Sequence, residues 1–203
     1  MVWVSIEYRW RVSNEPPSRA DSRSESTLNP QMHHSIAIGP LVASRLPFTF
    51  GRYELQEIIG EGGSARVFRA ELRGPAGFRK PVALKAIKPE IGGRSNEREI
   101  LDLVREACLV GRLKHPHIVD VYELGEWQGD LFLSMELVDG VTLSQLIRAN
   151  HSIPVSVVLE IAIALAAGLA KAHAFHSEGR SAGLVHRDLK PSNILLYWDG
   201  AVK

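Results

Sequence analysis

The residues with the clearest chemical capacity lie close together at positions 186–193. This stretch holds a carboxylate (Asp188), a cation (Lys190) and an amide (Asn193), and an apolar, strand-like run follows it directly. A carboxylate can accept a proton or orient a hydroxyl, an ammonium can neutralise anionic oxygens, and an amide oxygen can bind a hard metal cation. These three groups side by side indicate a reactive site. The competing interpretation is a loop whose polar side chains only cap their own backbone.

A glycine-rich segment is the second feature with chemical capacity, and it separates two strand-like runs at residues 53–59 and 65–70. Its residues are Gly60, Glu61, Gly62, Gly63 and Ser64. Because glycine has no Cβ, such a hairpin can bring its backbone N–H groups into contact with phosphate oxygens. Considered alone, the segment is explained better by an ordinary tight hairpin.

Lys85 interrupts an otherwise apolar strand at residues 82–87. A buried ammonium is costly unless it is paired, so Lys85 needs an acidic partner unless it lies at an exposed strand edge. A helix is predicted over residues 96–113, because a capped start is followed by apolar residues at helical spacing. Glu106 and Glu99 share the inward side of this helix. The spacing leaves both open as partners of Lys85.

These features, in this order along the chain, resemble the signature set of protein kinases. The matching motifs are His186-Arg187-Asp188 with Asn193 five residues later, Gly60-x-Gly62-x-x-Ala65-x-Val67, and Val82-Ala83-Leu84-Lys85. Ala65 stands where the family has its third glycine. The resemblance implies that Asp188 accepts or orients the proton of a substrate hydroxyl, that Lys190 neutralises charge on the γ-phosphate, and that Asn193 binds Mg²⁺.

The resemblance also implies an ATP site and its lining residues. Met135 takes the place of the gatekeeper, the backbone of Glu136 and Val138 meets the adenine, and a His-Pro pair after the predicted helix favours Glu106 as the partner of Lys85. The implied nucleotide-binding residues are Gly60, Glu61, Gly62, Gly63, Val67, Ala83, Lys85, Glu106, Met135, Glu136, Val138 and Leu195. The Lys190-Pro191 pair resembles the serine/threonine branch and implies protein Ser/Thr hydroxyls as substrates. The style of the motifs resembles bacterial members.

The fold class implied by the resemblance is α+β. It comprises a complete five-stranded N-lobe with one main helix, followed by the first part of a mainly helical C-lobe. We expect a disordered tail over residues 1–50, because residues 13–31 are rich in Ser, Arg, Pro and acids. An ATP-binding N-lobe then covers residues 51–137, and the hinge with a partial C-lobe covers residues 138–203.

Asp199-Gly200 predicts a tight turn into a strand at residues 201–203. In the family this strand leads to the D-F-G aspartate, which binds Mg²⁺, and the sequence stops at Lys203 before that motif. We therefore expect an N-terminal fragment of a kinase domain. The alternatives are a non-catalytic nucleotide-binding or interaction fragment and a small-molecule phosphotransferase.

Composition excludes several classes of function. The formal net charge of +1 gives no field that favours nucleic acid or an anionic membrane. Cys108 is the single cysteine, so an internal disulfide is excluded; a cytoplasmic location fits, and we expect Cys108 to be a small core residue. Polar residues interrupt the apolar run at residues 153–172, which predicts a buried helix of a soluble domain and no membrane segment. Its inward face is expected to carry Val158, Ile161, Leu165 and Leu169. The sequence does not indicate an oligomeric state.

Overall fold

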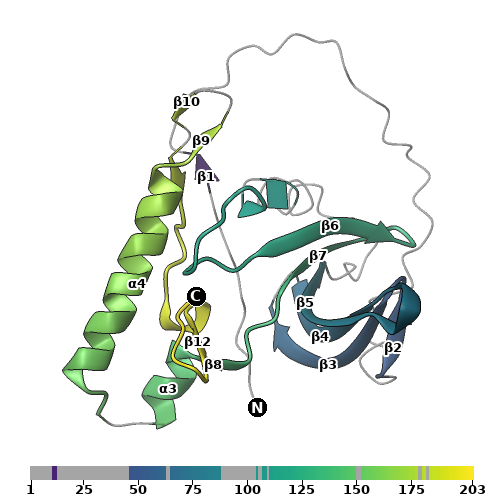
Figure 1. Cartoon of the computed structure of the whole chain (residues 1–203), viewed down its shortest axis with the longest axis horizontal. Helices are drawn as coiled ribbons and strands as arrows, with labels where there is room; N and C mark the ends of the chain where they lie inside the picture. Colours follow the sequence, from purple (N-terminus) through teal and green to yellow (C-terminus); the bar gives the residue numbers. More distant parts are fainter. Residues whose placement is uncertain are drawn as a thin grey trace.

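The computed structural model describes residues 11–12, 46–62, 65–87, 104, 107–108, 110–149, 152–177, 180–181 and 183–203. A curled, six-stranded antiparallel sheet forms the N-terminal part (Figure 1), in the order β2-β3-β4-β5-β7-β6. The strands are β2 (Phe48–Phe50), β3 (Tyr53–Glu61), β4 (Ala65–Arg73), β5 (Arg79–Ile87), β6 (Val121–Trp127) and β7 (Asp130–Glu136). The five strands expected from the sequence are β3 to β7, so the expected N-lobe sheet is confirmed.

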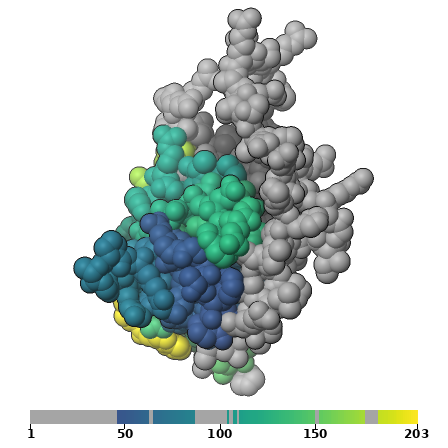
Figure 2. All heavy atoms as spheres, turned by 90° about the vertical axis from the view of Figure 1, so that its right-hand side faces the viewer, coloured from purple at the N-terminus to yellow at the C-terminus, as the bar shows by residue number. Residues whose placement is uncertain are grey.

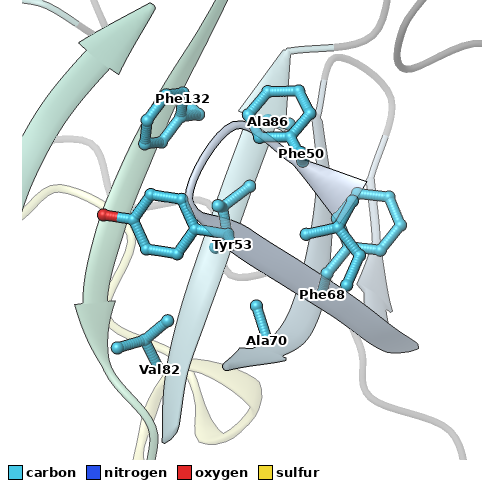
Figure 3. Close-up of a cluster of buried hydrophobic side chains, with 9 residues drawn as sticks. Phe50, Tyr53, Phe68, Ala70, Val82, Ala86 and Phe132 are labelled. Atoms are coloured by element: carbon cyan, nitrogen blue, oxygen red, sulfur yellow. The ribbon is translucent and has the colours of Figure 1, made fainter. Parts of the chain in front are cut away.

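The sixth strand, β2, shows that the expected tail boundary at residue 50 is wrong. β2 pairs with β3, and the Phe50 side chain is fully buried. Its ring meets Phe132 edge-on at 5.2 Å in an aromatic cluster on one face of the sheet (Figure 3). Burying a side chain of this size stabilises the fold by roughly 2 kcal/mol, which helps to offset the entropy of ordering a short edge strand.

A two-residue strand near the N-terminus also contradicts a uniformly disordered tail. β1 (Arg11–Val12) pairs antiparallel with β11 (Leu184–Val185), with Arg11 opposite Val185 and Val12 opposite Leu184. β11 leads directly into His186. An N-terminal segment therefore lies beside the strand that enters the predicted catalytic loop.

The predicted helix at residues 96–113 lies largely outside the described residues. Within it, positions 104, 107, 108 and 110 are helical, Ala107 and Val110 are buried, and Cys108 is exposed. The expectation that Cys108 is a core residue is wrong. One residue corresponds to about 100° of rotation around a helix, so the neighbour of inward-facing Ala107 turns toward solvent.

The C-terminal part is made of short strands and two helices around the predicted loop. Its elements are β8 (Gly140–Thr142), α3 (Leu143–Ala149), α4 (Val155–His173), β9 (His176–Ser177), β10 (Arg180–Ser181), β11, a 3₁₀ turn (Pro191–Asn193) and β12 (Leu195–Tyr197). The backbone amide of Gln145 donates to the Thr142 hydroxyl at 3.1 Å, so Thr142 caps the start of α3. After α4, β9 and β10 pair as an antiparallel hairpin.

Helix α4 is buried along one face only. Ile161, Ala164, Gly168 and Ala172 face inward, whereas Val155, Val158, Leu159 and Ile163 are exposed. The prediction of an inward face is therefore confirmed for Ile161 and wrong for Val158. In the part of the chain that the structure describes, α4 is the one helix long and apolar enough to cross a membrane. A helix packed in a globular core meets the same criterion, so this finding alone does not indicate a membrane span.

The sheet and the C-terminal part are joined after β7, where β8 pairs antiparallel with β12. Gly140 pairs with Tyr197 so closely that a Cβ on Gly140 would lie 1.8 Å from the Leu196 carbonyl oxygen. In the space-filling view the C-terminal residues, in yellow, lie along the lower edge of the block formed by the sheet (Figure 2). The segment that carries Leu195 is thereby held against the strand that leaves the sheet.

Candidate active site

The predicted catalytic loop connects β11 to β12, and its polar residues converge on Asp188. The Asn193 amide Nδ2 donates to the Asp188 backbone carbonyl at 2.8 Å and to Asp188 Oδ2 at 3.0 Å. Lys190 Nζ lies 2.9 Å from the same Oδ2. Among the described residues, no partner contacts Asp188 Oδ1. The structure thus brings the three predicted catalytic residues together and leaves one carboxylate oxygen available.

The electrostatic surroundings keep Asp188 ionised. Partial burial alone would raise the pKa of Asp188, but the hydrogen bonds from Lys190 and Asn193 outweigh it and hold that pKa below its ordinary value. The backbone is also constrained, because the Asp188 amide donates to the His186 carbonyl at 2.8 Å and closes a tight turn. Arg187, in the middle of this turn, has φ of +59°, a strained conformation for a non-glycine residue. The turn fixes the position of Asp188, and the strained backbone of Arg187 is the cost.

The His186 side chain supports the loop through a contact with the Asp188 backbone. Its ring is buried, and Nδ1 lies 3.3 Å from the Asp188 amide, which donates to it. Burial is the largest influence on this imidazole and holds its pKa below the ordinary value. These contacts give His186 a supporting role in the loop.

The lowered pKa of His186 predicts an acid-dependent loss of stability. Below the unfolded-state pKa of about 6.5 the unfolded chain binds a proton more readily than the folded chain, so the free energy of unfolding falls as the pH is lowered. One group contributes at most about 1.4 kcal/mol per pH unit. His186→Asn, which keeps an acceptor near the Asp188 amide without a titrating ring, should flatten this dependence between pH 7 and pH 5.

Urea unfolding at a series of pH values measures this effect. His173, exposed at the end of α4, provides the matched control, because His173→Asn should leave the slope unchanged. Equal slopes for the wild type and His186→Asn would contradict the prediction.

The side chains expected to line the adenine site lie in one buried apolar cluster, called the adenine slot below. Val67 and Ala83 come from the sheet, Met135 and Val138 from the end of β7 and the segment after it, and Leu195 from β12. All five side chains are buried in one cluster. These residues are separated by up to 128 positions in sequence, so the structure brings the predicted adenine-binding set together. Slots of this kind, with a few placed polar groups, are typical of ligand sites.

The predicted phosphate-binding residues are placed in part. Gly60 and Glu61 end β3, and the Gly62 amide donates to the Ala65 carbonyl at 2.9 Å across the hairpin. Lys85 on β5 is 7 % exposed and lies opposite Val67, so the buried-lysine interpretation is confirmed over the exposed edge. Gly63, Glu99 and Glu106 lie outside the described residues. The pairing of Lys85 with Glu106 therefore stays a prediction.

The chemical types of the described site residues are those that bind ATP and Mg²⁺. Nδ2 of the Asn193 amide donates to Asp188, and amide and carboxylate oxygens of the kind that Asn193 and Asp188 carry are the ligands that Mg²⁺ prefers. The side chains of the adenine slot are apolar, as an aromatic base requires. Asn193 and Asp188 lie on the loop that continues into the floor of the slot.

Comparison with known proteins decides the family. Residues 53–203 match the model described as the protein kinase domain. This chain is a member of the protein kinase family. The kinase motifs expected from the sequence all lie within the matched residues, so the recognition made from the motifs is confirmed.

Curated bacterial kinases are similar to this chain. It is 38% identical to "Tyrosine-protein kinase MasK" of Myxococcus xanthus over 160 residues, which cover 76% of this chain and 24% of that protein. It is 35% identical to "Serine/threonine-protein kinase PknD" of Mycobacterium tuberculosis over 147 residues, covering 72% of this chain and 20% of that protein. This member of the family thus spans about a fifth to a quarter of the length of the curated relatives it matches.

Solved kinase structures confirm the fold. The kinase domain of Mycobacterium tuberculosis PknI superposes with a TM-score of 0.58 at 31% identity, covering 77% of this chain and 59% of that chain. A structure titled "PpkA-294 apo form" gives a TM-score of 0.65 at 23% identity, covering 77% and 58%, and supports the fold alone. The kinase-like α+β fold expected from the sequence is therefore confirmed.

One functional candidate was missed from the sequence. Only the backbone of Glu136 was expected to take part in the site, yet its side-chain carboxylate binds Tyr197 and Lys203. The sequence held a weak signal, because Glu136 follows a largely apolar run and Lys203 stands in the strand predicted after Asp199-Gly200. Their sequence separation gave no reason to pair them.

Proposed function

We propose that this chain is the nucleotide-binding and catalytic-loop part of a protein kinase that transfers the γ-phosphoryl group of Mg-ATP to protein Ser/Thr hydroxyls. The observation that carries the proposal is the arrangement at Asp188. Lys190 and Asn193 both bind Oδ2, while Oδ1 has no partner among the described residues. An ionised carboxylate with one oxygen held and the other available can orient an incoming hydroxyl.

In this proposal each residue of the site has a separate role in the transfer. The substrate hydroxyl oxygen attacks the γ-phosphorus, the bond from that phosphorus to the β,γ-bridging oxygen breaks, ADP leaves, and Asp188 Oδ1 receives the hydroxyl proton. Lys190, beside Asp188, offsets negative charge on the γ-phosphoryl oxygens, and buried Lys85 does so for the α- and β-phosphates. Mg²⁺ bound through Asn193 would supply further charge neutralisation. Positioning and electrostatics supply most of the catalysis in this type of reaction.

The proposed substrate class rests on the loop sequence and on the relatives. Lys190-Pro191 follows the serine/threonine pattern, and PknD carries that activity in its name. MasK is named a tyrosine kinase. Phosphoamino-acid analysis of a labelled general protein substrate separates the two, and phosphotyrosine alone would overturn the Ser/Thr assignment. We also propose a cytoplasmic location, which suits a chain whose single cysteine, Cys108, is exposed.

Nucleotide binding tests the first half of the proposal. Lys85→Met should weaken binding of a fluorescent ATP analogue by about 10-fold or more, because it removes a buried positive charge from the predicted phosphate position. Lys80→Met is the control. Lys80 lies on the same strand, with Nζ 3.6 Å from the centroid of the Tyr122 ring, and should bind the analogue as the wild type does.

Failure of the wild-type chain to bind the analogue would contradict the proposed ATP site. Binding that is followed by no transfer of γ-phosphate to any substrate would instead assign this chain the non-catalytic nucleotide-binding role. Phosphorylation of a metabolite and of no protein would favour the small-molecule phosphotransferase.

A further inference from the structure

The side chain of Glu136 is held by donors from three separate segments. Tyr197 Oη donates to Oε1 at 2.5 Å, while Lys203 Nζ lies 2.9 Å from Oε2 and the Asp120 amide donates to Oε2 at 3.0 Å. The side chains of Glu136 and Lys203 are 18 % and 12 % exposed. Both carboxylate oxygens are thus occupied inside the fold, in surroundings where a lost partner is costly.

The electrostatics agree with this geometry. Burial alone would raise the pKa of Glu136, but the contacts with Tyr197, Lys203 and the Asp120 amide outweigh it and lower that pKa. Burial, followed by the hydrogen bond to Glu136, raises the pKa of the Tyr197 hydroxyl. Glu136 is therefore a carboxylate anion and Tyr197 a neutral donor at neutral pH.

Backbone hydrogen bonds connect these contacts to Leu195, a member of the adenine slot. Leu195 and Lys203 exchange two backbone hydrogen bonds, each of 2.8 Å. Tyr197 continues the same strand and pairs with Gly140. The carboxylate of Glu136 is consequently tied, through Tyr197 and Lys203, to both ends of the strand that presents Leu195.

Glu136 is the neighbour in sequence of Met135, a member of the adenine slot. It stands between Met135 and Leu137 at the end of β7, and its backbone amide donates to the Asp120 carbonyl at 2.8 Å. Met135, Val138 and Leu195 belong to one buried cluster with Val67 and Ala83. The carboxylate of Glu136 therefore adds side-chain contacts between the end of β7 and β12 to the backbone pairing of β8 with β12.

We propose that the Glu136 side chain is a positioning residue, which fixes β12 and Leu195 against the end of β7 and thereby sets the affinity of the slot for a nucleoside triphosphate. This rests on the proposed ATP site. Preorganisation of this kind raises affinity because the ligand does not have to order the slot when it binds. Residues that couple parts of a site without touching the ligand change such equilibria by roughly 0.5–2 kcal/mol.

The test compares nucleotide affinity in matched glutamate variants of the full chain. Glu136→Gln should weaken binding of a fluorescent ATP analogue about 3- to 30-fold, measured well below the melting temperature. Glu71→Gln is the control. The Glu71 side chain is 19 % exposed and pairs with Arg79 at 2.9 Å, but it is not part of the adenine slot. Glu71→Gln should therefore bind the ATP analogue with the affinity of the wild type.

A double-mutant cycle separates positioning from general destabilisation. Lys203→Met should weaken binding, and the loss in Glu136→Gln combined with Lys203→Met should be smaller than the product of the two single losses, because both act through one contact. Amide hydrogen exchange should rise at Leu195 in Glu136→Gln and remain unchanged in Glu71→Gln.

The outcomes distinguish this inference from the proposed function. A wild-type chain that binds no nucleotide contradicts the proposed function itself. Wild-type binding together with unchanged affinity in Glu136→Gln, an equal loss in Glu71→Gln, or fully multiplicative losses in the cycle overturns the positioning role alone. If Glu136→Gln does not fold, Tyr197→Phe removes a single hydrogen bond from the same carboxylate and is judged by the same criteria.

Discussion

Asp188→Asn is expected to reduce phosphoryl transfer by about 10²- to 10⁴-fold while nucleotide affinity stays close to that of the wild type. Asparagine keeps the size of the side chain but loses the ionised oxygen that would receive the hydroxyl proton. It also loses the charge that holds Lys190 at 2.9 Å. The measurement is magnesium-dependent transfer of labelled γ-phosphate to a general protein substrate, with analogue binding recorded in parallel.

The matched control for Asp188→Asn is Asp199→Asn. Asp199 is exposed in the turn after β12, where its carboxylate accepts from the Ala201 amide at 3.0 Å, so asparagine can serve the same turn. Transfer should be unchanged in this control. Equal transfer by the wild type and Asp188→Asn would show that Asp188 does not act on the hydroxyl.

Gly140→Ala is expected to destabilise the fold strongly, and more than Gly77→Ala does. The new Cβ would meet the Leu196 carbonyl oxygen at 1.8 Å and the Tyr197 Cα at 2.9 Å. Both are backbone atoms and cannot rotate away, so β8 and β12 must separate. We expect a loss of about 3 kcal/mol, which corresponds to a melting temperature roughly 6–12 °C lower for a chain of this size.

Gly77→Ala separates the steric effect from the conformational one. Gly77 has φ of +79° with no atom within 4 Å of its ideal Cβ, so alanine there adds backbone strain without a clash. It should cost only about 1 kcal/mol. Comparable melting temperatures for the two variants would contradict the close approach at Gly140. Because β12 carries Leu195, nucleotide affinity should also fall in Gly140→Ala alone.

Local sequence patterns predicted the strands and the catalytic loop because the physical causes there are local. Lys85 stands inside an apolar run, and only a paired or ligand-facing lysine satisfies such a strand. Asp188 and Asn193 lie five positions apart on one loop and meet as expected. Spacing along the chain is sufficient in such cases.

The misplaced residues depend on contacts that spacing does not contain. The inward face of α4 is one such case, because Val158 was expected on it and is exposed. The strand β2 is ordered because Phe50 meets the ring of Phe132 from a distant strand. The contacts of Glu136 with Lys203 likewise need the folded sheet before the two residues are neighbours.

The pairing of β1 with β11 has a practical consequence for work on this protein. A chain started at Met32, or one that carries a purification tag joined near residue 11, would lose or disturb the strand beside Leu184 and Val185. The uncovered edge would expose backbone donors and acceptors two residues from His186, available to a neighbouring polypeptide. The choice of first residue therefore becomes an experimental variable for catalysis and for solubility alike.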